Sequence, residues 1–172
     1  MNSQYERQLK MVLEQTFESL AFMFPLCEGE CGMGAEPMSA ADSCPEHAQQ
    51  TQVQDATRAA WVTFAGPFCG AVLIEVGVGL PPILTAGMLG LEDGQRPSDA
   101  QQDDALKELL NVVCGNLLPV ISDSQKEFTV HAPALAGMEA KPGALEALQP
   151  ACQVEMLFDG GRARATLLVD KQ

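Results

Sequence analysis

Glu108 and Asn111 stand three residues apart within DDALKELLNVVCGNLLPV, the stretch from residue 103 to residue 120. At this spacing two side chains are neighbours on one face of a helix. A carboxylate can bind a lysine or arginine of a partner, and an amide can hold a water molecule through one donor and one acceptor. Positioning a water is useful when the electrophile is already activated, as an acyl phosphate is. Asparagine is otherwise a mediocre choice in mid-helix, because its amide competes for backbone hydrogen bonds.

The same stretch predicts an amphipathic helix over 103–120 with two opposite faces. At 100° per residue, one narrow stripe contains Asp104, Glu108, Asn111 and Gly115. The broad apolar face opposite must pack on a sheet, and it comprises Leu106, Leu109, Leu110, Val113 and Leu117. The stripe must then face solvent or a partner, and a glycine, which costs roughly 1 kcal/mol against alanine in a helix, would let a partner approach closely. Asp104 and Gly115 are therefore predicted partner-binding positions, although an ordinary solvated helix face would show the same pattern.

The remaining elements are predicted from the periodicity of apolar residues and from turn residues. They are a helix over 4–24, strands over 59–66 and 68–77, a short helix over 80–93, a strand within 127–137 and a hairpin over 151–172. Asp159-Gly160-Gly161 supplies the turn of that hairpin, and Ser98 or Asp99 is the expected cap of the central helix. This order predicts one α/β domain (α+β layered) over 1–172 with at least partly antiparallel pairing. No GxGxxG or GxxxxGKS/T motif marks a nucleotide-binding fold.

Composition limits the kinds of partner. The 172 residues carry 10 basic and 23 acidic side chains, a net charge of −13, and 47% of them are hydrophobic. Such a surface repels nucleic-acid phosphates and anionic membrane leaflets, and it favours a partner with a basic patch. No stretch approaches the roughly 20 apolar residues of a membrane helix, and the N-terminus lacks the apolar core of a signal peptide. We therefore expect a cytoplasmic protein whose cysteines are mostly reduced.

Residues 25–57 form an irregular insertion with no sustained period. Within it, Cys27-x3-Cys31 and Cys44-x2-His47 provide three thiols and an imidazole. Such a set could bind zinc tetrahedrally and order a segment that has little core of its own. Free thiols or an occasional disulfide are the preferred alternative, because the spacing of the first pair is not the common C-x2-C. A small zinc-stabilised adaptor is therefore a minor hypothesis for the chain.

The spacing Asp104-x3-Glu108-x2-Asn111, followed some twenty residues later by Pro133, resembles the signature of the CheC/CheX/FliY chemotaxis phosphatases. The surrounding ELLNVVCGNLLPVI resembles the CheX helix in particular. FTVHAPALAG resembles the CheX strand that ends in a proline-containing turn, and GPFCGAVLIEVG with the following LPPILTAGMLG resembles that family's strand and helix. The resemblance covers residues 58–137 and implies a CheX-like fold.

That fold has two similar halves, each contributing a long helix to the same face of a mostly antiparallel sheet. Glu14, Glu18 and Ala21 repeat the spacing of the central stripe, so the helix over 4–24 looks like a degenerate copy with alanine in place of the amide. The resemblance thus implies one active surface, as in CheX, and not two as in CheC. An ordinary acidic helix face is the alternative for the two glutamates. The family likeness also implies a homodimer that pairs through sheet edges.

Members of this family remove the phosphoryl group from the aspartate of a phosphorylated response regulator such as CheY. The resemblance implies that Glu108 pairs with the regulator's active-site lysine and that Asn111 orients the attacking water. The Mg²⁺ ion belongs to the regulator, so the chain is expected to need no cofactor of its own. The expected partner is a phosphorylated CheY-type regulator, and the expected activity is that of a hydrolase. The alternative is a CheX-like binding module that docks on a receiver domain without catalysing hydrolysis.

Overall fold

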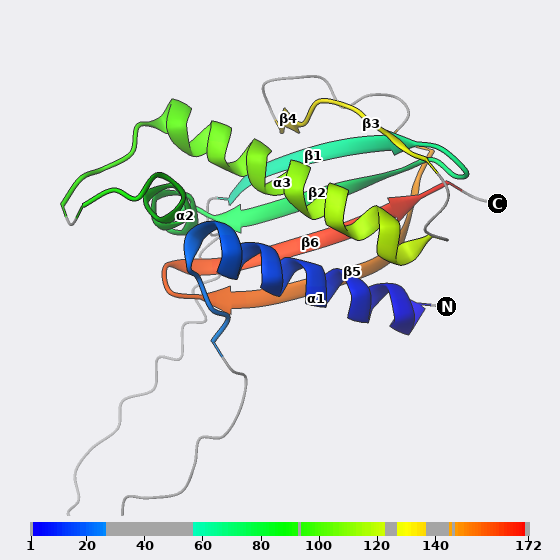
Figure 1. The fold of residues 1–172 in the computed structure, drawn as a ribbon, viewed down its shortest axis with the longest axis horizontal. Coiled ribbons are helices and arrows are strands. Elements are labelled where there is room, and N and C mark those ends of the chain that lie inside the picture. Colours follow the sequence, from blue (N-terminus) through cyan, green and yellow to red (C-terminus); the bar gives the residue numbers. More distant parts are fainter. Residues whose placement is uncertain are drawn as a thin grey trace, which may run out of the picture.

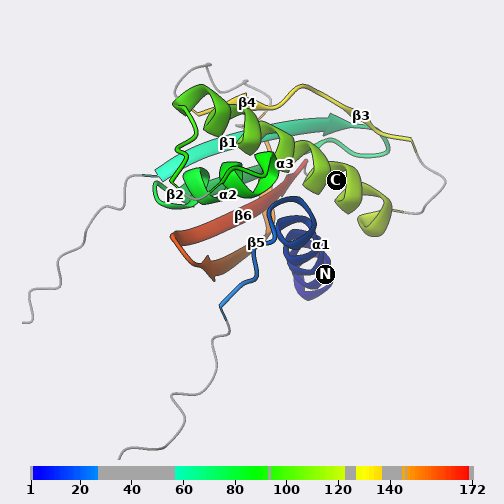
Figure 2. The same ribbon diagram turned by 60° about the vertical axis from the view of Figure 1, so that its left-hand side comes forward.

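Three helices cover one face of a single sheet in the computed structural model (Figures 1 and 2). The structure describes residues 2–26, 57–92, 94–122, 127–136, 145 and 147–170. The elements are α1 (Asn2–Ala21), β1 (Thr57–Ala65), β2 (Gly70–Gly77), α2 (Leu80–Leu89), α3 (Asp99–Ile121), β3 (Thr129–Val130), β4 (Ala134–Leu135), β5 (Gln149–Phe158) and β6 (Gly161–Val169). This arrangement of helices on one side of a sheet confirms the predicted layered α/β class.

The sheet has the strand order β3-β1-β2-β6-β5, with β4 also pairing with β1. Every pairing among the described strands is antiparallel. Two hairpins, β1–β2 and β5–β6, therefore lie side by side and are joined through the β2–β6 ladder. The second hairpin turns at Asp159-Gly160, two of the three residues predicted, and Gly161 already begins β6. Gly160 has φ 93°, a left-handed conformation that glycine adopts without a steric penalty.

The two long helices give the fold its two halves. α3 packs on β1 and β2, whereas α1 packs on β5, so each hairpin has one long helix above it. The helices run in opposite directions, since the Gln8 side chain near the start of α1 donates a hydrogen bond of 2.9 Å to the carbonyl of Val120 near the end of α3. The pseudo-repeated architecture implied by the family likeness is thus present.

The core lies between the three helices and the face of the sheet that they cover. Strand β5 shows the alternation that this requires, because Cys152, Val154, Met156 and Phe158 are buried while the residues between them are exposed. The ring of Phe17 from α1 packs on that of Phe158, with their centroids 4.5 Å apart. Aromatic burial of this kind joins the N-terminal helix to the C-terminal hairpin.

Some element boundaries differ from those predicted. The first helix ends at Ala21, not residue 24, because Phe22 adopts a left-handed φ of 55° and reverses the chain well before Pro25. The central helix begins at Asp99, four residues earlier than expected. The strand predicted within 127–137 is divided into β3 and β4, which both pair with β1.

The zinc hypothesis falls on residues that the structure does not describe. Cys27, Cys31, Cys44 and His47 all lie within 27–56, outside the described ranges. In the part of the chain that is described, no three His, Cys, Asp or Glu side chains are grouped so that they could hold a metal ion. No helix of that part is long and apolar enough to cross a membrane.

The three described cysteines differ in burial, and they should therefore differ in how fast an alkylating reagent modifies them. Burial raises the pKa of the Cys114 thiol to about 12, and burial together with the nearby charge of Glu6 raises that of Cys152 to about 11. Cys69 is exposed. Treatment of the folded protein with iodoacetamide at pH 8, followed by peptide mapping, should label Cys69 quickly and the other two only after unfolding.

Both thiols also link stability to pH. Above pH 9.0, the ordinary thiol pKa, the unfolded chain loses protons that Cys114 and Cys152 keep in the folded state. The free energy of unfolding should therefore fall as the pH rises from 9 towards 11. Labelling of Cys114 as fast as that of Cys69 in the folded protein would contradict this account of burial.

Candidate functional site

Helix α3 has the two opposite faces expected from its sequence. The five apolar residues named above, Leu106, Leu109, Leu110, Val113 and Leu117, are each 0% exposed and belong to the core. The four stripe residues, Asp104, Glu108, Asn111 and Gly115, are all exposed. The helix thus presents a carboxylate and an amide on its outer side, while its inner side is held by burial that is worth roughly 2 kcal/mol for each leucine.

The N-terminus of α3 is fixed by a capping box. Ser98 is the N-cap, and its side chain accepts a hydrogen bond from the backbone N–H of Gln101. The Gln101 side chain in turn accepts one of 2.8 Å from the backbone N–H of Ser98. Such a cap is typically worth about 1 kcal/mol. It confirms Ser98, one of the two predicted candidates, as the N-cap of the helix.

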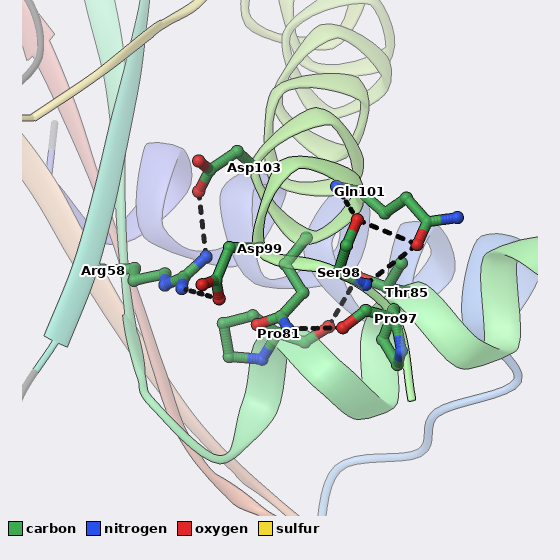
Figure 3. Close-up of polar contacts among 9 residues, drawn as sticks. Arg58, Pro81, Thr85, Pro97, Ser98, Asp99, Gln101 and Asp103 are labelled. Carbon is green, nitrogen blue, oxygen red and sulfur yellow. Dashed lines mark hydrogen bonds and ion pairs between the residues drawn. The ribbon is translucent and has the colours of Figure 1, made fainter. Parts of the chain in front are cut away.

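An arginine on the sheet fixes how α3 lies across β1 (Figure 3). The Arg58 guanidinium donates one hydrogen bond of 2.9 Å to Asp103 and another of 2.7 Å to Asp99. These two carboxylates are four residues apart, so one planar guanidinium can reach both. Arg58 therefore adds a fixed point between β1 and the first turns of α3, beside the buried apolar face that sets the direction of the stripe.

Sequence reasoning did not identify Arg58. The signal that could have revealed it is the pair Asp99 and Asp103, whose spacing of four residues places two carboxylates on one side of the helix. The cation that joins them is more than 40 residues away in the sequence, so its identity depends on the tertiary fold.

Along the stripe, Asp104 is in an ion pair and Glu108 is in none with a described residue. Asp104 forms an ion pair of 2.7 Å with Lys107, one helical turn away. Among the residues that the structure describes, the side chains of Glu108 and Asn111 form no hydrogen bond or ion pair with one another or with any other group. The carboxylates at the start of α3 are thus neutralised within the chain, whereas Glu108 and Asn111 are available to a partner.

The end of the stripe is open. A Cβ atom added at Gly115 would meet no atom within 4 Å, so the packing of the chain itself does not require a glycine there. Pro119 lies inside the same helix and has no N–H, so the Gly115 carbonyl lacks its usual helical donor. A partner could therefore approach the backbone of α3 closely at this point.

Helix α1 does not offer a second pair of this kind. Glu18 is exposed, but Ala21, the residue at the position corresponding to Asn111, is only 6% exposed. Helix α2 covers it, since a Cβ added at Gly87 would overlap the carbonyl oxygen of Ala21. Glu14 lies 4.0 Å from Lys10 in an ordinary i,i+4 pair. The acidic face of α1 is thus without an amide, and α2 blocks the place where one would stand.

Pro133, the last residue of the resemblance, lies between β3 and β4 at the edge of the sheet and is partly buried. It is on a different element from the stripe. The site is therefore a single helix edge made by Glu108 and Asn111, with Asp104 and Gly115 at its ends. Such an edge can bind a cation and hold a water molecule, but it contains no strong nucleophile.

A family model described as "Chemotaxis phosphatase CheX" matches residues 58–147, slightly more than half of the chain. The match includes α2, α3 and the first hairpin. No sequence among the curated proteins matches the chain.

Solved structures show the same fold over nearly the full length. A chemotaxis protein CheX from Desulfovibrio desulfuricans has a TM-score of 0.62 at 13% identity, covering 96% of this chain and 99% of its own. A CheC-like superfamily protein from a Shewanella species has a TM-score of 0.60 at 18% identity, covering 99% of this chain and 100% of its own. A CheX-CheY-BeF3-Mg²⁺ complex from Borrelia burgdorferi has a TM-score of 0.56 at 12% identity, covering 97% and 98%.

The anchoring role of Arg58 predicts a measurable loss of stability. Arg58→Ala removes both bonds to α3, and because the Arg58 side chain is 30% exposed we expect the free energy of unfolding to fall by about 1 kcal/mol. Urea denaturation should show this loss at low salt and a smaller one at high salt. Arg96→Ala, at an exposed arginine in the loop before α3, is the matched control. Equal effects of the two substitutions would contradict the anchor.

Two glycines should respond oppositely to the same substitution. Gly87→Ala should destabilise the protein by about 1–3 kcal/mol, because the new methyl group meets the backbone of Ala21. Gly115→Ala should stabilise it by up to about 1 kcal/mol, because the site is open and alanine favours the helix. Thermal unfolding of both variants measures the difference. A loss of stability in Gly115→Ala would show that a glycine is required there by the fold.

Proposed function

The chain belongs to the CheX family of chemotaxis phosphatases, and we propose that it removes the phosphoryl group from the aspartyl phosphate of a CheY-type response regulator. The observation that carries this proposal is the unpaired, exposed pair Glu108 and Asn111 on a rigidly anchored helix. The Borrelia protein that shares the fold forms a complex with CheY in the presence of BeF3 and Mg²⁺, which supports a regulator of this type as the partner.

Glu108 provides the docking contact in this proposal. Its carboxylate forms no ion pair with a described residue. A lysine at the regulator's active site can therefore pair with it without breaking an existing bond. The net charge of −13 attracts a basic surface over a longer range and raises the rate of encounter. Asp104 lies one turn away and adds to this field, although Lys107 partly neutralises it.

Asn111 performs the positioning step. Its amide lies one turn beyond Glu108, so docking of Glu108 brings it to the aspartyl phosphate, where it holds a water in line with the bond that breaks. The regulator contributes the phosphorylated aspartate and its Mg²⁺ ion, and this chain needs no cofactor of its own. The open surface at Gly115 lets the two backbones come close enough for the amide to reach the phosphoryl group.

The chain is also proposed to act as a homodimer. Strand β5, of ten residues, is an edge of the sheet and pairs with β6 on one side. Apart from that ladder, the backbone hydrogen bond described for β5 is the one from the N–H of Leu26 to the carbonyl of Leu157. No other described strand pairs with β5 on this side, and a sheet edge of this length can pair with a second copy. Such a dimer leaves the stripe of α3, which lies over the other hairpin, open to the regulator.

The test is the rate of phosphate loss from a phosphorylated CheY-type regulator of the same organism, measured together with binding. Asn111→Ala should bind as the wild type does but lose about 100-fold in the accelerated rate, because the water is no longer positioned. Glu108→Ala should weaken binding by about tenfold through the loss of one charged contact.

Each variant has a matched control on the same protein. Asn116→Ala removes an exposed asparagine of α3 that lies off the stripe, and Glu18→Ala removes an exposed glutamate of α1. Both should behave as the wild type. Binding of the phosphorylated regulator without any change in its lifetime would instead identify the chain as a non-catalytic binding module. An unchanged rate in Asn111→Ala would contradict the water-positioning role.

A further inference from the structure

A hollow of about 300 Å³ lies between α2 and α3, beside the proposed docking residue. Its walls are mainly apolar and come from two elements, with Thr85, Met88 and Leu89 on α2 and Asp104, Ala105 and Glu108 on α3. Leu89 is 51% exposed, so a large apolar side chain that lines the hollow is also open to solvent. The hollow therefore adjoins the stripe of α3, because Asp104 and Glu108 belong to both.

The hollow is preformed, because both of its walls are fixed. Gly87 packs directly on the backbone of Ala21, so α2 cannot move towards the end of α1 without a clash. The inner face of α2 is packed in the core, since Leu80, Leu84 and Thr85 are each 0% exposed. The opposite wall is α3, which Arg58 and the capping box hold on the sheet (Figure 3). A partner therefore meets a rigid surface and loses little binding energy to rearrangement.

The charges around the hollow define what fits. Asp104 and Glu108 both contribute to its wall, so a cationic side chain is favoured beside whatever enters. Its volume is at the lower limit of small-molecule sites, which suits one apolar side chain better than a cofactor. Since Glu108 belongs to both the hollow and the stripe, a single docked surface contacts the two together.

We propose that this hollow receives one apolar side chain, of about the size of leucine or methionine, from the surface of the response regulator, next to a lysine or arginine that pairs with Glu108. The inference rests on the proposed function, and it names the contact that selects the partner. The hollow sets affinity and specificity, whereas Asn111 sets the rate of phosphate loss once the regulator is bound. Regulators with a polar residue at the matching position bind weakly.

The experiment compares substitutions of Leu89 in the full chain. Leu89→Asp should raise the Kd for the beryllofluoride-activated regulator by about tenfold, with the rate of phosphate loss at saturation unchanged. Leu89→Met keeps an apolar side chain and should bind as the wild type does. Val78→Asp is the matched control, because Val78 is 54% exposed in the loop before α2 and does not line this hollow. Thermal unfolding should show that both aspartate variants are folded.

The outcomes separate this inference from the proposed function. If Leu89→Asp binds as tightly as the wild type while Asn111→Ala loses the accelerated rate, the hollow is not a docking site and the phosphatase function stands. If Leu89→Asp changes the oligomeric state in light scattering without regulator, the occupant is a second copy of the chain and the proposal is wrong. If the wild type neither binds the regulator nor shortens its phosphorylated lifetime, both proposals fail.

Discussion

Burial of one face of α3 against the sheet is the constraint on which the site depends. The apolar side chains of that face are fully buried, and truncating any one leucine among them would cost about 2–5 kcal/mol. A rotation of α3 that turned Glu108 inward would lose several of these contacts and would also bury a carboxylate that has no described partner. The outward direction of Glu108 and Asn111 is therefore set by the core, and not by contacts of their own.

Because the buried face of α3 holds the helix in place, its exposed face can carry residues that weaken the helix locally. Asparagine and glycine together cost α3 roughly 1.5 kcal/mol compared with alanine at the same positions. The capping box and the bonds of Arg58 to Asp99 and Asp103 offset a loss of that size. A rigid helix can thus display an amide at a fixed position, and local departures from the best helix formers are expected where a surface has a function.

The features that could be predicted from the sequence are those that depend on local periodicity and on turn residues. The two faces of α3 follow from a spacing of three and four residues, and the β5–β6 hairpin follows from Asp159-Gly160 between alternating runs. The early start of α3 at Asp99 is a local feature, set by the capping box of Ser98 and Gln101, whereas the other features that sequence analysis did not predict require contacts between distant parts of the chain. The packing of α2 on Ala21 joins two distant segments, and the hollow beside Glu108 exists only because α2 and α3 are placed side by side. The roles of Glu108 and Asn111 stay predictions.

The central claim is that the outer edge of α3 meets the phosphorylated site of a response regulator. The most direct measurement is the NMR signal of the Asn111 side-chain amide as the regulator is added, with and without beryllofluoride as the phosphoryl mimic. The account predicts a shift of that signal with the activated regulator and a much weaker one without beryllofluoride, with few changes along α1. If the Asn111 amide is unchanged while signals of another surface shift, the regulator docks elsewhere and the proposed site is wrong.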